Sequence, residues 1–391
     1  MYLIFIIILY LFVNNPIFVG IEIGSVKLLY IIALLFFLFN RKSILVFKRY
    51  KTESILYLLL IIYVLLRTIF GSDSDMLRTI IVAFIECLIL PVFIVEFYYK
   101  YLSKTYFYKP ILIVGSIGAV ISSLCFFIPE INLFFRSIQQ MTEEMFYIEN
   151  RGYGLSEGLT YSYSLVQACI FYIGLTNLKT NKWFIFFIPF LFLSVAFNAR
   201  IGIIILFVGL LIYLLQNRNF KQLIYSILIF VIVFLFLIQI DFESINNFAF
   251  IWVREFFYEM SDTLFNTQLA QFNTVDTLFY DMYVVPGTIS EWIVGRGNTM
   301  FGVMGGTDVG YLQLLNYGGL VLISLFAILI FHMSKRILKF KFYFFLLFFL
   351  SVFFISEIKG NYIPNSGAFR FLCLLYVFMI ETKNRTIFNQ A

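Results

Sequence analysis

The sequence has little charge for its length. Only 13% of its 391 residues are Asp, Glu, Lys or Arg, whereas 62% are hydrophobic. A soluble domain is nearer a quarter charged and half apolar, so the composition excludes that class. Runs such as 223–237 and 343–354 carry almost no polar side chains, and an apolar helix of about 20 residues crosses the ~30 Å hydrocarbon core of a bilayer. The sequence therefore predicts an all-α polytopic membrane protein, with residues 1–391 as a single integral membrane domain.

Reactive and metal-binding side chains are also scarce. The four cysteines all fall inside apolar runs without a C-x-x-C spacing, which predicts buried thiols rather than a disulfide framework or a zinc site. The only histidine, His332, lies at the inner end of a predicted span. We expect no metal and no cofactor, so chemistry on the outer face would have to use carboxylates, tyrosines and arginines.

Twelve membrane spans are predicted. The first apolar run lacks the basic segment and the small-residue cleavage site of a signal peptide, so we expect it to remain as a helix. It is interrupted at Asn14, Asn15 and Pro16. The approximate bounds are 1–19, 24–40, 54–70, 78–98, 110–128, 160–177, 183–198, 201–216, 223–240, 310–332, 343–358 and 367–380.

Lysine and arginine set the predicted orientation. With the N-terminus in the cytoplasm, every second loop is basic, beginning with 41–52, as the positive-inside rule requires. This arrangement puts 18 of the 28 basic residues inside, together with both termini. A missing or extra span would break the alternation, so the pattern favours twelve spans. The outer face then carries two large loops, about 129–159 and 241–309, and within the second loop residues 243–282 are predicted to form an interfacial amphipathic helix.

The basic residues differ in type on the two faces. Inside, 13 of 18 are lysine, whereas eight of the ten outer ones are arginine. The positive-inside rule does not distinguish the two residues, so another explanation is needed. Arginine presents a planar fork that matches pairs of phosphate or carboxylate oxygens, whereas lysine is a point charge. The outer arginines therefore indicate a phosphate or pyrophosphate held near the lipid headgroups.

Arg200 is the clearest of these arginines. It lies in SVAFNARIGIIIL (194–206), on a predicted hairpin between the seventh and eighth spans that contains no acidic residue. A charge at the edge of the bilayer needs a partner, so Arg200 is predicted to bind an anionic ligand. For the other outer arginines, ion pairing or snorkelling is the alternative; Arg67 and Arg78, for example, flank the acidic loop GSDSD.

Two segments of the outer loops are candidates for chemistry. The first, IENRGYGLSEGLTYSYSL, places Arg151 before glycines that allow tight turns and close approach to a ligand, and Glu157 is a carboxylate at the mouth of the next span. An ordinary helix N-cap between Ser156 and Thr160 is the alternative. The second, GRGNTMFGVMGGTDVGYLQLLNYGGL, contains Asp308 and leads into a span whose outer half is polar. It lacks the GK[ST] ending and the preceding strand of a nucleotide-binding loop.

Three motifs, taken in order, resemble the O-antigen polymerase (Wzy) family and its relative, the O-antigen ligase. One is the R-x-x-G turn at Arg151–Gly154 before a span. Another is NARIG (198–202), similar to the S/N-x-R-x-G of that family. The third is the G-x-G…D-x-G-Y element followed by NYGG (316–319). The span count, the inner termini and the large late outer loop agree, so the resemblance covers most of the chain.

The resemblance implies a GT-C-like glycosyltransferase of the bacterial inner membrane. Such an enzyme transfers a glycan from undecaprenyl pyrophosphate to another lipid-linked repeat unit on the periplasmic side. The implied partners are this lipid-linked oligosaccharide, membrane lipid and a chain-length regulator, with no nucleic acid. The implied site residues are Arg200, Arg151, Arg254 and Arg296 for the pyrophosphate, Tyr311 and Asn316 for the substrate, and Glu157 or Asp308 as the base for the acceptor hydroxyl.

Two departures from the family pattern bear on the choice of function. The ligases usually carry a histidine in the large outer loop, and its absence here favours a polymerase. The R-x10-G spacing of some polymerases is also absent, because Phe265 and Thr307 stand where glycines would follow Arg254 and Arg296. A ligase and a lipid-linked oligosaccharide flippase or transporter remain alternatives. A flippase needs polar residues deep in many helices, whereas mid-span charges here are few.

Overall fold

The structure is a computed structural model. It describes residues 1–19, 24–102, 106–139, 151–156, 162–217, 282–301, 306–360 and 367–388, without the side chains of Lys42, Arg200, Lys359 and 386–388. Within these ranges the chain is helical, with no strand and only two isolated bridges, Ile17↔Gly24 and Phe18↔Gln139. Helices are expected for such a sequence because an apolar environment forces the backbone to satisfy its own N–H and C=O groups. The all-α prediction is confirmed for this part of the chain.

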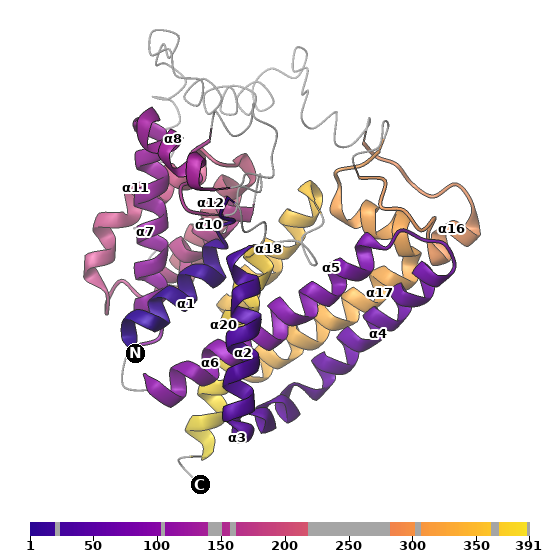
Figure 1. The fold of residues 1–391 in the computed structure, drawn as a ribbon, viewed down its shortest axis with the longest axis horizontal. Helices are drawn as coiled ribbons and strands as arrows, with labels where there is room; N and C mark the ends of the chain where they lie inside the picture. The colour runs from indigo at the N-terminus through magenta and orange to yellow at the C-terminus, as the bar shows by residue number, and fades with distance from the viewer. Residues whose placement is uncertain are drawn as a thin grey trace. The chain divides into compact units, whose positions relative to one another are not determined.

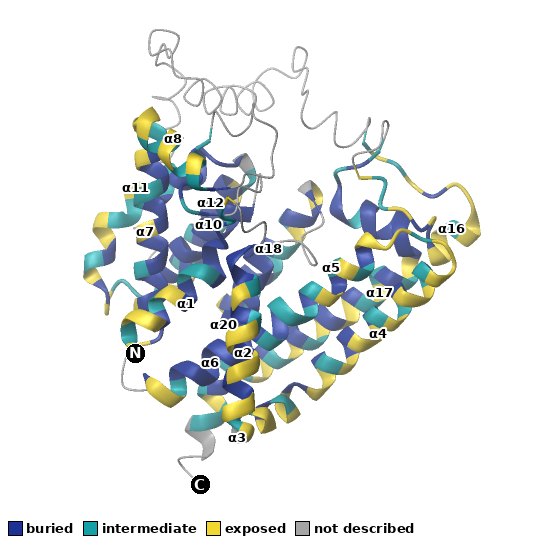
Figure 2. Ribbon diagram, viewed as in Figure 1, coloured by how far each residue is buried: buried dark blue, intermediate teal, exposed yellow. Residues whose placement is uncertain are grey.

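The helices divide into two compact units (Figure 1). Unit 2 contains α1 (Tyr2–Asn14), α7 (Tyr108–Phe127), α8 (Pro129–Ile138), α10 (Ser162–Thr176), η3 (Lys182–Phe187), α11 (Ile188–Ala196) and α12 (Arg200–Asn217). Its central helix is α10, which packs against α7, α11 and α12 and is almost wholly buried (Figure 2). A Cβ on Gly202 would lie 1.9 Å from Ser164 Oγ, so glycine is what lets α12 approach α10 so closely.

Unit 1 contains the remaining helices. These are α2 (Ser25–Phe39), α3 (Arg41–Ile44), η1 (Leu45–Tyr50), α4 (Lys51–Ile69), α5 (Asp75–Phe84), the π-turn η2 (Ile85–Ile89), α6 (Leu90–Tyr101), α16 (Ile289–Val294), α17 (Gly310–Lys339), α18 (Tyr343–Lys359) and α20 (Gly367–Phe388). Helix α17 packs against α4, α16, α18 and α20, and α20 also packs against α6. The exposed face of α4 presents leucine and isoleucine side chains such as Leu58 and Ile62 (Figure 2), as a lipid-facing helix does.

The helices are those of a membrane-embedded protein. Four stretches within the described ranges are long and apolar enough to cross a bilayer: Leu45–Ile69, Asp75–Tyr101, Tyr108–Phe127 and Gly310–Lys339. Shorter apolar helices fall on most of the other predicted spans. The ninth predicted span, 223–240, and the predicted interfacial helix at 243–282 lie outside the described residues.

The first predicted span is shorter than expected. Helix α1 ends at Asn14, Asn15 takes a positive φ of 45°, and the N–H of Ser25 bonds to the carbonyl of Pro16 at 3.0 Å. The reason is local, because a residue before proline is disfavoured in the α region and Asn tolerates the left-handed conformation. The chain therefore turns at Asn15 instead of continuing as a helix to residue 19.

The segment predicted as the first large outer loop contains a helix, α8, that the sequence analysis did not predict. Helix α8 follows α7 after a single extended residue, Ile128, with Pro129 in its first turn. None of its residues is buried, and Leu133 and Phe134 are both exposed by more than half. Proline is well placed at the start of a helix because its missing N–H is not needed there. Residues 140–150 and 157–161, which include the predicted base Glu157, lie outside the described residues.

Candidate functional site

Two of the predicted motifs meet in unit 2. The amide nitrogen of Asn198, in NARIG, donates to the carbonyls of Gly152 at 3.4 Å and Ser194 at 2.7 Å, and to Ser122 Oγ at 3.0 Å. Ser122 Oγ itself donates to the Gly152 carbonyl. Segments 46 residues apart in the chain are thereby joined. We call residues 151–156 together with 198–202 the corner.

The glycines of the corner are required by its packing against α7. A Cβ on Gly152 would lie 2.6 Å from the backbone oxygen of Ser122. Gly154 has a φ of +60°, and a Cβ there would lie 2.5 Å from Ile121. A larger residue at Gly152 would push the loop away from α7, because the backbone oxygen of Ser122 cannot yield. At Gly154 the positive φ itself disfavours any other residue. The R-x-x-G pattern thus corresponds to a loop pressed onto a helix.

Neutral side chains hold the corner in place. Ser156 Oγ donates to the Tyr153 carbonyl at 2.5 Å, and Tyr10 of α1 donates to the Leu155 carbonyl at 2.9 Å. On the other side, Ser164 Oγ of α10 donates to the carbonyls of Val195 at 2.9 Å and Ala199 at 3.2 Å. The loop and the turn before α12 are therefore fixed by hydroxyl groups of α1, α7 and α10 and by the amide of Asn198 in the turn itself.

The structure places the two corner arginines differently. Arg151 is half-buried, and its Nη1 donates to the hydroxyl of Tyr153 at 2.9 Å. Arg200 is the first residue of the 18-residue helix α12, after a turn of three residues from the end of α11. Its backbone lies at a helix N-terminus, where N–H groups and the helix dipole favour anions. The side chain of Arg200, Arg254 and Glu157 all lie outside the described residues.

The third motif, NYGG, forms a break in α17 of unit 1. Gly319 has φ 63° and ψ −164°, a conformation that interrupts the helix. A break of this kind frees carbonyls that would otherwise accept intrahelical bonds. The carbonyl of Asn316 accepts from the backbone N–H of Arg296 at 2.5 Å, and that of Tyr317 from the N–H of Gly297 at 3.1 Å. The carbonyl of Gly318 accepts from the Tyr63 hydroxyl at 2.6 Å. We call residues 284–297 with 316–319 the cap.

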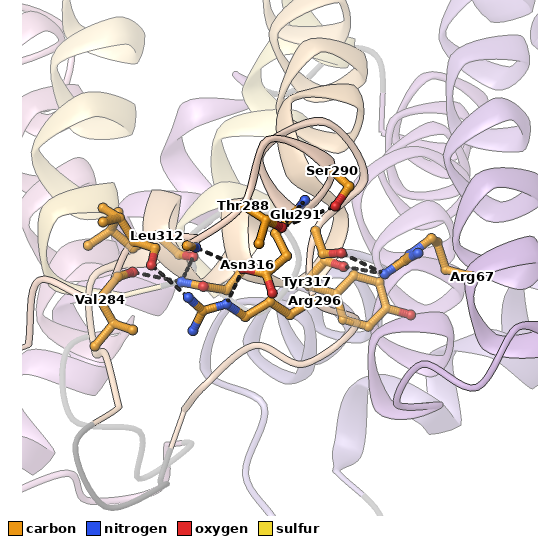
Figure 3. A network of polar contacts seen from close by, with 12 residues as sticks. Arg67, Val284, Thr288, Ser290, Glu291, Arg296, Leu312, Asn316 and Tyr317 are labelled. Carbon is orange, nitrogen blue, oxygen red and sulfur yellow. Dashed lines mark hydrogen bonds and ion pairs between the residues drawn. The ribbon is translucent and has the colours of Figure 1, made fainter.

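Arg67 is part of the cap rather than an ion pair with the neighbouring loop. Its Nη2 lies 3.1 Å from the Gly295 carbonyl and 3.5 Å from the Tyr317 carbonyl (Figure 3). The GSDSD loop contributes through its backbone instead, because the Asp73 N–H donates to Gly297 at 2.9 Å and the Asp73 carbonyl accepts from Tyr317 at 3.0 Å. The alternative of Arg67 pairing with the acids of that loop is therefore not what the structure shows.

Arg296 is paired with a carboxylate. Its Nε donates to Glu291 Oε2 at 3.0 Å and its Nη2 to the Val285 carbonyl at 2.8 Å (Figure 3). The N–H of Gly287 donates to the same carboxylate at 2.8 Å. These bonds, that from Gly287 first, lower the pKa of Glu291. Arg296 would have to leave this carboxylate before it could bind a phosphate.

The remaining predicted residues lie at the start of α17. Asn316 is fully buried, and its amide nitrogen donates to the carbonyls of Val284 at 2.8 Å and Leu312 at 2.9 Å (Figure 3). Its Oδ1 has no partner. Tyr311 packs against the apolar cluster of Val309, Leu312 and Leu315, and Asp308 is half-buried just before the helix. These residues belong to unit 1, whereas the corner belongs to unit 2.

Sequence reasoning missed an ion pair in the middle of unit 1. Glu86, in the π-turn η2, accepts from Tyr30 at 2.6 Å and pairs with Arg370 of α20 at 2.6 Å. A glutamate within an apolar run was the only signal in the sequence, and it did not identify a partner 284 residues away. π-turns inside helices are frequent at functional sites.

Other carboxylates of unit 1 that are buried also pair with arginines. Glu53 pairs with Arg336, Glu381 with Arg49, and Glu96 with Arg385. The single histidine, His332, lies with its Nε2 3.6 Å from Glu53 Oε1. Among the described residues, no three His, Cys, Asp or Glu side chains are grouped closely enough to hold a metal ion.

Comparison of the chain with protein-family models, with curated proteins and with solved structures gives no match in any of the three. The function therefore has to be argued from the corner, the cap and the charged groups themselves.

Proposed function

We propose that the protein is a glycan polymerase of the bacterial inner membrane, with about twelve spans, a GT-C-like fold and both termini in the cytoplasm. It would transfer an undecaprenyl-pyrophosphate-linked glycan to another lipid-linked repeat unit at the periplasmic face. The observation that carries the proposal is the contact between Asn198 and Gly152, because it brings the Arg151 turn and the start of α12 into one corner.

The corner has the properties of a pyrophosphate site. Arg151 and Arg200 supply two permanent positive charges, and α12 begins at Arg200 with no acidic residue in its first turn. Guanidinium groups bind phosphate oxygens in pairs, and a helix N-terminus adds N–H donors and a favourable dipole. The turns at Gly152 and Gly154 keep the loop close to α7. The neutral side chains of Ser122 and Asn198 join its two segments.

The reaction follows from these roles. The acceptor hydroxyl oxygen attacks the anomeric carbon of the donor glycan, and the bond from that carbon to the pyrophosphate oxygen breaks. The electron pair of that bond leaves with undecaprenyl pyrophosphate, and Arg200 and Arg151 stabilise the developing negative charge. The proton of the hydroxyl passes to a carboxylate, Glu157 or Asp308. Arg254, Arg296, Tyr311 and Asn316 are further proposed contacts of the substrate, and a chain-length regulator is a proposed partner.

A gene deletion tests the class of function. Loss of a polymerase leaves single repeat units on the surface lipid, which a gel of the surface glycan resolves from long chains. A deletion strain that still makes normal long chains would rule out the polymerase. Within the site, Arg200→Lys is expected to shorten the chains strongly because lysine cannot bind two oxygens at once. The matched control is Arg78→Lys, an exposed outer arginine, which should leave chain length unchanged.

A flippase or transporter of lipid-linked oligosaccharide is the second candidate. Two observations favour it: α17 is broken at Gly319, and the Glu86–Arg370 pair lies within the helices of unit 1. Transporters often use broken helices and intramembrane charges. The same deletion separates the readings, since loss of a flippase removes surface glycan altogether and loss of a ligase leaves polymer that is not attached to the lipid core.

A further inference from the structure

Two buried amide side chains in unit 2 lack hydrogen-bond partners. Gln167 of α10 is fully buried and Asn14, at the end of α1, is 2% exposed. Within the part of the chain that the structure describes, neither the nitrogen nor the oxygen of either amide has a hydrogen-bond partner. Buried polar groups are nearly always bonded in proteins, and they are costly when they are not. Two such amides indicate a site for a group that the protein itself does not supply.

The two amides converge on one point of α7. A Cβ built on Gly118 would lie 2.9 Å from Gln167 Nε2, 3.3 Å from Asn14 Oδ1 and 3.5 Å from the Tyr163 hydroxyl. Any side chain at residue 118 would therefore occupy the space that these polar atoms face. The Tyr163 hydroxyl already donates to the Gly118 carbonyl at 2.8 Å. We call Asn14, Gly118, Tyr163 and Gln167 the amide site.

The chemistry of the amide site selects an uncharged ligand. Each amide offers donors and an acceptor whichever way it is turned, and the hydroxyl of Tyr163 adds another polar group. None of the four residues carries a charge to balance an ion, and burial of an unbalanced charge is very costly. A hydroxyl group, which donates one hydrogen bond and accepts two, matches such a set of partners.

The amide site is linked to the corner by polar groups along α7. Ser122 lies one helical turn beyond Gly118, and it bonds to both Gly152 and Asn198 of the corner. Tyr163 packs edge-on against Tyr153 of the corner, with ring centroids 6.4 Å apart. The site therefore adjoins the corner proposed to hold the pyrophosphate.

We propose that the amide site binds a neutral hydroxyl group, bridged between Asn14 and Gln167. The hydroxyl has two sources, a buried water molecule or a sugar of the glycan attached to the pyrophosphate; the second source rests on the proposed function, and the first does not. In both cases the same residues surround the hydroxyl, and a methyl group on Gly118 would exclude it.

Two variants test the proposal on the full-length protein in lipid nanodiscs. Gln167→Leu removes one amide, and Gly118→Ala keeps both amides but fills the point on which they converge. Cys169→Ala, a change to another buried residue of α10, serves as the packing control. Two probes are compared: lipid-linked oligosaccharide extracted from cells that carry the gene, and undecaprenyl pyrophosphate without sugar.

If a sugar supplies the hydroxyl, both variants weaken binding of the oligosaccharide probe at least tenfold, and binding of the sugar-free probe is unchanged. If water supplies it, both affinities stay the same, but radiolytic hydroxyl-radical labelling of Tyr163, which is only 4% exposed, is strong in the wild type and lost in Gly118→Ala. Absence of both effects overturns the proposal. A wild-type protein that binds neither probe would refute the proposed function, and the labelling of Tyr163 would still decide whether the amide site holds a hydroxyl.

Discussion

The corner of unit 2 and the cap of unit 1 both attach a glycine-containing loop to a helix, but they do so with different side chains. In the cap, Arg67 donates to backbone carbonyls and Arg296 is paired with Glu291. In the corner, Ser122, Asn198 and Ser164 make the joining contacts. The comparison teaches that an outer arginine is not by itself a sign of a ligand site. Its role depends on whether the backbone around it needs a donor.

The strongest test of this comparison is at the helix break of the cap. Gly319→Ala would place a Cβ 2.3 Å from the Ile293 carbonyl at a φ of +63°. Backbone strain and overpacking together should destabilise the protein by about 3 kcal/mol, visible as a lower melting temperature in detergent. Gly71→Ala is the control for strain alone, because Gly71 also has a positive φ but no atom within 4 Å of a Cβ. Equal losses of stability in both variants would contradict the close contact between Gly319 and the Ile293 carbonyl.

The next effect is expected in the corner. Asn198→Ala removes a fully buried amide that bonds to Gly152, Ser122 and Ser194. It should lower stability by about 2 kcal/mol, since buried acceptors lose their donor, and it should shorten the glycan chains by more than the loss of folded protein explains. Chain length normalised to the amount of protein in the membrane is the measurement. A purely proportional loss would mean that the corner is structural only.

A smaller effect is expected for Arg67 in the cap. Arg67→Ala removes donors to the Gly295 and Tyr317 carbonyls and should lower stability by about 1–2 kcal/mol. Chain length per folded protein should stay normal, in contrast to the corner. Arg78→Ala, which changes the exposed arginine that follows the GSDSD loop in α5, should leave the melting temperature unchanged. If Arg67→Ala instead abolished activity in fully folded protein, Arg67 would have to be counted among the residues that bind the substrate.

The smallest effect concerns pH. Hydrogen bonds from Gly287 and Arg296 lower the pKa of Glu291 from its ordinary value of 4.5. The carboxylate therefore stabilises the cap above pH 4.5, and this contribution is lost as the pH falls through the lowered pKa. Fluorescence of the adjacent Trp292 should change over that acidic range in the wild type. In Glu291→Gln the change should be absent, and an identical titration in both proteins would contradict the assignment.

The sequence predicted some parts of the corner and the cap but not their partners. The turns at Gly152 and Gly154 were predicted, because the conformational freedom of glycine is local. The break of α17 at Gly319 was not predicted, since the sequence indicated a continuous span over 310–332. The contact of Asn198 with Gly152 did not follow, because it joins separate helices whose packing no short motif encodes. For the same reason Arg67 was expected to pair with nearby acids, and the structure pairs it with carbonyls over 200 residues away.

The sequence by itself determined that this is a helical protein for a membrane, because composition and the length of apolar runs are properties of each segment alone. It also contains the residues at which two helices are interrupted, Asn15–Pro16 and Gly319, although the predicted spans 1–19 and 310–332 ran through both places. Only the tertiary structure decided which polar groups lie together: Glu86 with Arg370, Arg67 with the carbonyls of the broken α17, and the amides of Asn14 and Gln167 beside Gly118. Hydrogen bonds and ion pairs act over a few ångströms, so their partners are fixed by helix packing rather than by any neighbour in the chain.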